Sequence, residues 1–193
     1  MRDSSQEIKL ERYEVRMSRP EGQITDTEPL ELWEYTLIMA KLEPHWQFFY
    51  QLLWETGIRV SEALKLKRRD LENTGVWVTR TKRKDHPREH LPLSPGFYTR
   101  VRSWLELSPR LVIFPYTASA AWLALKKACA EAGVRQSIHP HSFRHGLGTR
   151  ARQAGYDIAV VQRLLGHASI RSTERYFKAT RSEVENALRK LNT

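Results

Sequence analysis

Two basic side chains stand together at a predicted helix start. His141 and Arg144 are three residues apart, directly after Pro140, so a helix beginning here carries both on one face. Backbone N–H groups at a helix start also point outward and favour an anion. An imidazole beside a guanidinium at that position therefore predicts a site for an oxyanion.

The same turn offers a metal site as an alternative, because His139 and His145 flank this pair. Histidine ligands in metal sites are normally joined by thiolates or carboxylates at short, regular spacing. The histidines at 139, 141 and 145 have no such partner at ligand spacing. We therefore expect no metal ion here.

A tyrosine adds a possible nucleophile. Tyr176 follows His167 by nine residues, and an arginine, Arg59, lies far upstream. Alone, such a tyrosine would be half-buried packing and such an arginine would be a surface charge. Together they provide what attack on a phosphodiester requires, since the nucleophile needs activation and the phosphorane needs its charge neutralised. Arginine suits the second task because it can bind two oxygens at once.

Three motifs in this order resemble the tyrosine recombinases, also called phage integrases. They are residues 56–64 (TGIRVSEAL), residues 141–145 (HSFRH), and residues 164–167 (LLGH) followed by Tyr176. The resemblance runs from about Asp26 to the C-terminus. Several independent motifs must coincide to produce it.

The resemblance implies a role for each residue. Tyr176 would be the nucleophile, forming a 3'-phosphotyrosyl link and releasing a 5'-hydroxyl. Arg59, Arg144 and His167 would hold the scissile phosphate, and His141 would assist proton transfer at the tyrosine. No metal, nucleotide or other cofactor is implied, because the phosphotyrosine conserves the bond energy for religation.

A basic segment, residues 80–88 (RTKRKDHPR), is too polar to bury and predicts a projecting hairpin. By resemblance, one of its lysines would protonate the leaving 5'-oxygen as general acid. Lys82 is preferred over Lys84, because it follows Thr81 where the strand turns. The remaining cations of the segment are expected to contact the DNA backbone: Arg80, Arg83, Lys84 and Arg88.

The composition fits such a partner. The chain has 193 residues, with 32 Lys and Arg against 22 Asp and Glu, which gives a net charge of +10. A basic protein gains affinity for double-stranded DNA by releasing condensed counterions, although ordinary solubility charge is the alternative explanation. The lone cysteine, Cys129, excludes an intramolecular disulfide, and we expect it to be an inert thiol on a core face. No apolar run approaches the roughly 18 residues of a membrane span, so we expect a cytoplasmic protein without a membrane partner.

The pattern predicts an α+β fold, mostly helical, with one small antiparallel sheet. Strands are expected at 76–79 and 90–93, with a turn at 73–75 before the first. Helices are expected near the following segments: 30–38, 44–57, 59–64, 95–105, 122–132, 142–153, 157–165, and a short one containing Tyr176. Gly146 and Gly148 depart from the pattern of the sixth of these helices, because each weakens a helix by roughly 1 kcal/mol relative to alanine.

Two domains follow from this organisation. Residues 1–25 would form an N-terminal arm or linker, and residues 26–193 the catalytic domain. Family members commonly carry a separate N-terminal helical domain that closes around DNA, which residues 1–25 cannot supply. The domain would end in a helix at 182–191, whose apolar stripe is expected to mediate self-association on DNA; packing on its own domain is the alternative.

Two other functions remain open from the sequence. A type IB topoisomerase-like enzyme would use the same tyrosine chemistry to relax supercoils, although such enzymes generally have a lysine where His141 stands. A DNA-binding module that keeps the fold without catalysis is the third. The DNA site and the direction of the reaction, whether integration, excision or resolution, are not encoded in any recognisable motif.

Overall fold

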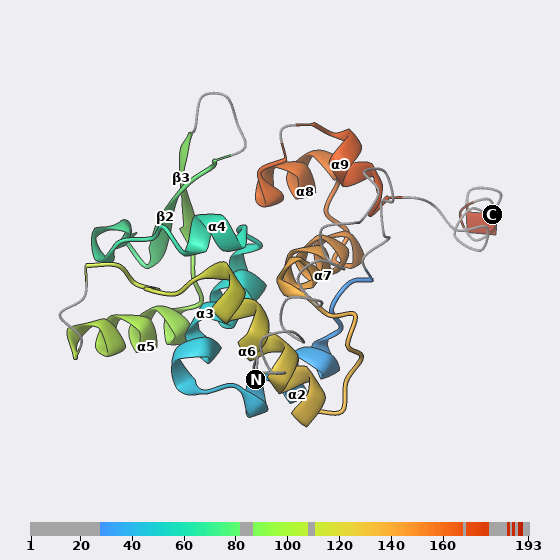
Figure 1. The fold of residues 1–193 in the computed structure, drawn as a ribbon. Coiled ribbons are helices and arrows are strands. Elements are labelled where there is room, and N and C mark those ends of the chain that lie inside the picture. The colour runs from blue at the N-terminus through green and yellow to red at the C-terminus, as the bar shows by residue number, and fades with distance from the viewer. Residues whose placement is uncertain are drawn as a thin grey trace, which may run out of the picture.

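The computed structural model describes residues 28–81, 87–107, 111–167, 169–177, 185, 187 and 189–190. The predicted arm at 1–25 and most of the predicted helix at 182–191 lie outside this part of the chain. Figure 1 shows the elements in their order along the chain: α2 (Leu32–Lys41), α3 (Pro44–Thr56), α4 (Val60–Ala63), a 3₁₀ turn (Arg68–Asp70), β1 (Leu71–Glu72), β2 (Gly75–Thr79), β3 (Arg88–Pro92), α5 (Pro95–Glu106), α6 (Ala118–Glu131), α7 (Pro140–Gln153), α8 (Ile158–Leu165) and α9 (Arg171–Glu174).

Helix boundaries fall where local signals predict them. Helix α3 begins at Pro44 and ends at Gly57, which has a φ of 61° and donates its N–H to the Leu53 carbonyl at 2.9 Å. Helix α8 begins after Asp157, whose side chain accepts a hydrogen bond from the backbone of Val160, and it ends at Gly166, also at φ 61°. Glycine is favoured at such left-handed ends because it has no Cβ to clash.

The sheet is small and antiparallel, in the order β1-β2-β3. Val76 lies opposite Leu91 and Val78 opposite Glu89, which sets the register of the two longer strands. The turn predicted at residues 73–75 precedes β2, and it has positive φ angles at Asn73 and Thr74. A mostly helical α+β fold is therefore confirmed.

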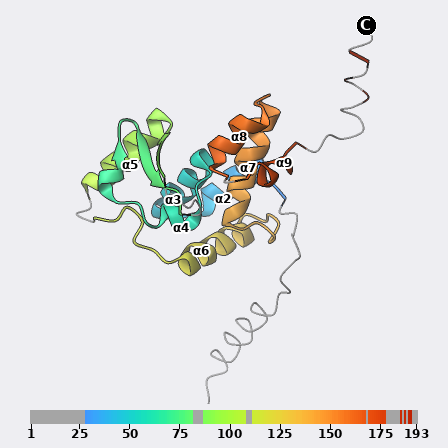
Figure 2. The same cartoon turned by 90° about the horizontal axis from the view of Figure 1, so that it is seen from above.

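The main core is built around α3. Its buried side chains Phe49, Tyr50 and Leu53 pack with residues of the other helices and of β2, and Cys129 of α6 is fully buried among them, as predicted. Seen from above, α3 and α4 lie between the β-sheet with α5 on one side and α7, α8 and α9 on the other (Figure 2). The centre of the molecule is thus aromatic and aliphatic.

Helix α2 buries less apolar surface than its spacing predicts. Ile38 is buried, but Trp33 and Leu37 remain 60% and 44% exposed. The buried position is taken by Glu34, whose carboxylate accepts hydrogen bonds from Arg135 Nε at 2.6 Å and Nη2 at 3.0 Å. Burial of this carboxylate is tolerated because it is paired.

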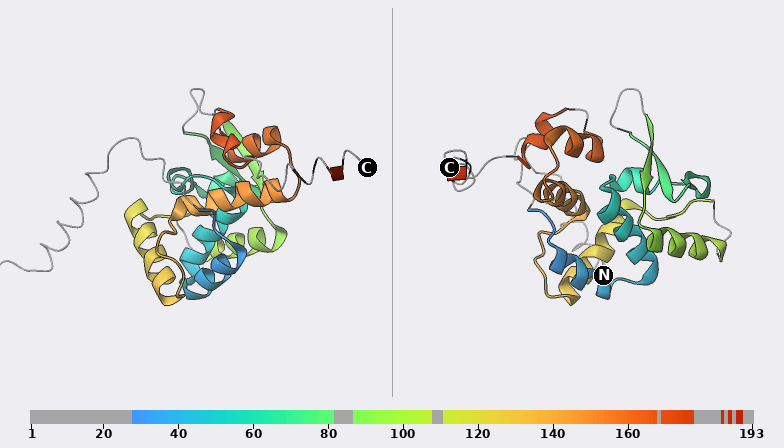
Figure 3. Two further views of the ribbon diagram at one scale, coloured as in Figure 1. Left: turned by 90° about the vertical axis from the view of Figure 1, so that its right-hand side faces the viewer. Right: turned by 180° about the vertical axis from the view of Figure 1, so that it is seen from behind.

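A second, smaller apolar cluster joins α7, α8 and the segment after α9. Its buried members are Ala151, Val161, Leu165 and Tyr176. Two opposite views place the β2–β3 pair and helices α8 and α9 at the same end of the molecule (Figures 1 and 3). None of the helices within the described residues is both long enough and apolar enough to cross a membrane.

Candidate active site

The loop before Arg59 lies directly against α7 and α8. A Cβ added to Gly57 would come within 2.8 Å of one Leu147 methyl carbon and 3.1 Å of one in Leu165. The Gly57 carbonyl accepts a hydrogen bond from Arg144 Nη1 at 2.6 Å. Glycine is therefore required here for close approach as well as for its φ angle.

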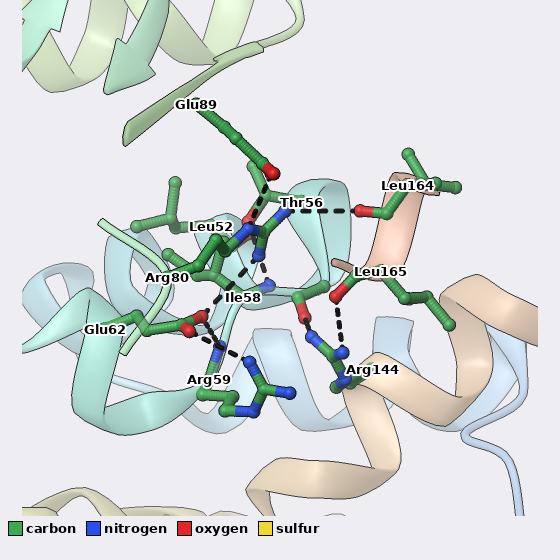
Figure 4. A network of polar contacts seen from close by, with 11 residues as sticks. Leu52, Thr56, Ile58, Arg59, Glu62, Arg80, Glu89, Arg144, Leu164 and Leu165 are labelled. Atoms are coloured by element: carbon green, nitrogen blue, oxygen red, sulfur yellow. Dashed lines mark hydrogen bonds and ion pairs between the residues drawn. The ribbon is translucent and has the colours of Figure 1, made fainter. Parts of the chain in front are cut away.

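Arg144 joins all three motifs. Its side chain is buried, and its two terminal nitrogens donate to the carbonyls of Gly57 and of Leu165, at the end of α8 (Figure 4). Burial, followed by the charges of Arg59 and Arg80, lowers the pKa of Arg144 to about 10. The guanidinium still carries its charge at neutral pH, in a place where few counterions offset it.

Glu62 holds Arg59 in place, a role that sequence reasoning missed. The Glu62 carboxylate accepts one hydrogen bond from the Arg59 backbone and one from its Nη1, both at 2.9 Å. The Glu62 side chain is fully buried, whereas the Arg59 side chain keeps 18% of its surface exposed. The spacing of three residues inside the first motif was the available signal, because a glutamate at the third position of a helix can accept from the backbone N–H of the residue before that helix.

Arg80 does not project with the hairpin, so the predicted exposure of this residue was wrong, and the structure gives no support to its predicted contact with DNA. Its side chain is fully buried, with Nε 2.8 Å from Glu89 and Nη1 3.6 Å from Glu62. Its Nη2 also donates to the Leu164 carbonyl of α8 at 3.4 Å (Figure 4). The alternation of a strand explains this placement, since Val76 and Val78 are buried on the same face and Arg80 is the next residue of that series.

Gly166 makes room for this arginine. A Cβ on Gly166 would lie 2.7 Å from Arg80 Nε. The end of α8 is therefore packed directly on the guanidinium, and it brings His167 to the site as the following residue.

The exposed part of the hairpin is described only at its base. Arg88 of β3 is 52% exposed in its side chain; its Nη2 lies 2.7 Å from Asp70, and its guanidinium carbon lies 5.2 Å from the centroid of the Trp77 ring. Lys82, Arg83 and Lys84 lie outside the described residues. The choice between Lys82 and Lys84 as general acid stays a prediction.

His167 is oriented by a buried threonine that sequence reasoning missed. Its Nδ1 lies 2.8 Å from the Thr173 hydroxyl, and Thr173 is fully buried. Burial, followed by the charges of Arg144 and Arg59, lowers the pKa of His167 to about 3. The ring is therefore neutral at physiological pH, with Nδ1 already committed to Thr173.

His141 lies in the first turn of α7, near the other two histidines. Its backbone N–H donates to His139 Nδ1 at 3.2 Å, and its ring centroid lies 4.7 Å from that of His145, with the two rings perpendicular. Within the described ranges, no group of three or more His, Cys, Asp or Glu side chains is placed to hold a metal ion.

Tyr176 lies in the turn after α9 rather than inside a helix, which corrects the predicted element. Helix α9 ends at Glu174, and the Tyr176 N–H donates to the Thr173 carbonyl at 3.0 Å. The Tyr176 hydroxyl lies 2.7 Å from Nδ1 of His145. Burial raises the pKa of this tyrosine, although the charges of Arg144 and Arg175 partly oppose that effect.

Close packing explains why two glycines, Gly146 and Gly148, stand inside α7. A Cβ on Gly148 would lie 2.6 Å from Cζ of Tyr176, so only glycine lets the ring pack on the helix. A Cβ on Gly146 would come within 2.8 Å of the Leu30 carbonyl and 3.2 Å of the Trp54 ring. The helix gives up intrinsic stability at these positions for close contacts.

The structure describes five of the six predicted catalytic residues. Arg144 hydrogen-bonds the segments before Arg59 and before His167. His145, the next residue, contacts both Tyr176 and the ring of His141. Such a cluster, with arginines, neutral histidines and a tyrosine on a mostly helical fold, defines a class of site suited to a phosphodiester. The family comparison agrees with this class. The model of the Phage integrase family matches residues 24–183, and the chain belongs to this family.

Two curated proteins with similar sequences are tyrosine recombinases. Tyrosine recombinase XerD of Chlorobaculum tepidum is 32% identical over 149 residues, which cover 70% of this chain and 49% of that protein. Tyrosine recombinase XerA of Pyrococcus furiosus is 29% identical over 152 residues, which cover 73% of this chain and 52% of that protein. The chain thus spans about half the length of these curated relatives.

Solved structures share the fold at low sequence identity. The crystal structure of XerA recombinase superposes with a TM-score of 0.70 at 20% identity, covering 93% of this chain and 68% of that one. The catalytic domain of bacteriophage HP1 integrase gives a TM-score of 0.65 at 20% identity, covering 85% of this chain and 95% of that one. The Tn1549 transposon integrase, solved with transposon right end DNA, gives 0.73 at 18% identity, covering 90% and 69%.

Proposed function

We propose that residues 26–193 form the catalytic domain of a site-specific DNA recombinase or integrase. The main support for this proposal is that Arg144 hydrogen-bonds both the loop before Arg59 and the end of α8 before His167. These two bonds join the segments that carry Arg59, Arg144 and His167, which supports a shared role of the three residues in binding a phosphate. The similarity to tyrosine recombinases over most of the described residues supports the same reaction class.

In the proposed reaction, Tyr176 Oη attacks the scissile phosphorus, and a phosphorus–oxygen bond forms as the bond to the 5'-oxygen breaks. The phenolic proton passes to the neutral imidazole of His141, and the hairpin lysine, Lys82 by preference, protonates the leaving 5'-oxygen. Arg59, Arg144 and His167 stabilise the charge on the non-bridging oxygens. Attack of a 5'-hydroxyl on the phosphotyrosine reverses each step and rejoins the strand.

The partner we propose is double-stranded DNA, bound as a self-associated assembly. The net charge of +10 supports the first part, and the exposed Arg88 at the base of the hairpin offers one contact. The structure of the Tn1549 transposon integrase contains DNA. Self-association rests on the apolar stripe of Val184, Leu188 and Leu191, which the sequence alone provides.

A covalent-trapping experiment tests the reaction without knowledge of the target. The chain is incubated with a pool of nicked duplexes of randomised sequence, in which the short strand beyond the cut diffuses away and prevents religation. Denaturing electrophoresis then separates protein linked to DNA, and sequencing of the trapped strands gives the site. We expect a protein–DNA adduct that survives denaturation.

Two tyrosine variants form the control pair. Tyr176→Phe should abolish the adduct, because it removes only the attacking oxygen. Tyr156→Phe, at a tyrosine that is 57% exposed in the turn after α7, should leave it unchanged. An adduct that persists in Tyr176→Phe, or the absence of any adduct across the pool at low salt, would contradict the proposal.

A further inference from the structure

His145 contacts the nucleophile, although nothing in the sequence motifs gave it a role. It follows Arg144 in α7, and its side chain is buried. Its Nδ1 lies 2.7 Å from the Tyr176 hydroxyl, and its Nε2 lies 3.3 Å from Nη1 of Arg175. Both ring nitrogens therefore have a polar partner within hydrogen-bond distance.

These two partners decide where the ring proton sits. A guanidinium has only donors, so Nε2 of His145 must accept from Arg175. Burial, followed by the charges of Arg175, His139, Arg144 and His167, lowers the pKa of His145 to about 4, which leaves one proton on the ring at neutral pH. That proton is on Nδ1, and it points at the tyrosine oxygen.

We propose that His145 is a catalytic hydrogen-bond donor to Tyr176, with its tautomer set by Arg175. The Nδ1–H group stabilises the phenolate as Tyr176 attacks, and again when the tyrosine is the leaving group in religation. The hydroxyl of Tyr176 can then direct its own proton away from His145. This inference rests on the proposed function and adds a residue to the same site.

The opposite assignment, His145 as general base, conflicts with its surroundings. A base at Nδ1 requires the ring proton on Nε2, where it would face an N–H of Arg175 donor to donor. This donor–donor contact with Arg175, at 3.3 Å from Nε2, disfavours Nδ1 of His145 as the acceptor of the phenolic proton.

The tautomer can be measured on the free protein. Long-range ¹H–¹⁵N correlation spectra of histidine-labelled protein distinguish the two ring nitrogens, and loss of one spin system in His145→Asn assigns the residue. We expect Nδ1 to be protonated in the wild type, and Arg175→Met to shift the ring toward the other tautomer. Protonation of Nε2 in the wild type, or an unchanged tautomer in Arg175→Met, would overturn the inference without touching the proposed function.

Single-turnover cleavage tests the catalytic role with the DNA found by covalent trapping. His145→Leu removes the donor and should slow adduct formation by about 10²-fold, as loss of one positioned donor does elsewhere. His145→Asn places an N–H₂ group where Nδ1 stood and should recover most of the rate. A fluorinated tyrosine at position 176, whose phenolate forms more readily, should reduce the defect of His145→Leu.

Matched measurements separate this role from folding. The affinity for DNA should be the same in both His145 variants, because both remove the contact between Nε2 and Arg175 and they differ only in the contact to the Tyr176 oxygen. Tyr50→Phe removes another buried hydrogen bond, to the Ala121 carbonyl at 2.5 Å, and should leave the cleavage rate unchanged. Equal cleavage rates for His145→Leu and His145→Asn would overturn the donor role. An inactive wild type would instead count against the proposed function. The spectra would still report the tautomer of His145 in that case. If His145→Leu does not fold, His145→Asn and Arg175→Met carry the test.

Discussion

At the residue scale, Gly148 determines where the nucleophile can lie. Any Cβ at this position would overlap the Tyr176 ring, with 2.6 Å to Cζ. Gly148→Ala should therefore displace the ring and break the hydrogen bond to His145, and we expect covalent adduct to fall at least about tenfold. The unfolding temperature should change little, because the gain of roughly 1 kcal/mol in helix propensity offsets part of the overpacking cost.

The control for this change is another glycine-to-alanine substitution in a helix. Gly96 lies in α5, and apart from its chain neighbours and the backbone of its own helix, no described atom lies within 4 Å of an added Cβ. Gly96→Ala should keep the full cleavage rate and a native unfolding temperature. Wild-type adduct formation by Gly148→Ala would show that the ring does not need this contact.

At the element scale, Arg80 ties the end of β2 to α4, β3 and α8 through Glu62, Glu89 and the Leu164 carbonyl. Arg80→Met would remove the buried cation from Glu89, 2.8 Å away, and from Glu62, which would keep only its pair with Arg59. Breaking a buried ion pair in this way costs about 3–5 kcal/mol, so we expect the free energy of unfolding in urea to fall by about that amount. Replacing Glu62 and Glu89 by glutamine in the same chain should recover much of the loss.

Arg88 offers the matched substitution in the same hairpin. Its side chain is 52% exposed, and a surface ion pair such as that with Asp70 contributes about 0–1 kcal/mol. Arg88→Met should therefore unfold like the wild type while it weakens DNA binding and lowers its salt dependence. Equal stability of Arg80→Met and Arg88→Met would contradict the buried network.

The elements also show what the sequence could predict. The ends of α3 and α8 were predictable because their signals are local, as with Pro44, Gly57 and Gly166. The motif residues were found by resemblance, whereas the contacts of Arg80 with Leu164 and of His145 with Tyr176 join residues 84 and 31 positions apart. Hydrophobic periodicity carries no information on such pairs, so counting charge alone placed Arg80 on the surface.

At the scale of the whole molecule, the site keeps buried histidines neutral, and this couples stability to pH. The pKa of His145 is lowered to about 4 and that of His167 to about 3, against 6.5 in an unfolded chain. Between about pH 6.5 and 4 the unfolded state therefore binds more protons than the folded state, and stability falls as the pH falls. Above pH 6.5 the histidine contribution is fully present.

This coupling predicts a measurable loss on acidification. For His145 alone, a shift of this size corresponds to about 3 kcal/mol, lost between neutral pH and pH 4. Urea unfolding at pH 7.5, 6 and 5 should show a steadily decreasing free energy of unfolding, with a smaller slope in His145→Asn. Burial lowers the pKa of His145 most, and the charged and titratable neighbours that lower it further are Arg175, His139, Arg144 and His167. Tyr50→Phe changes no group of this cluster, so its free energy of unfolding should lie below that of the wild type by the same amount at each pH. If His145→Asn shows the same dependence on pH as the wild type, His145 does not take up the proton.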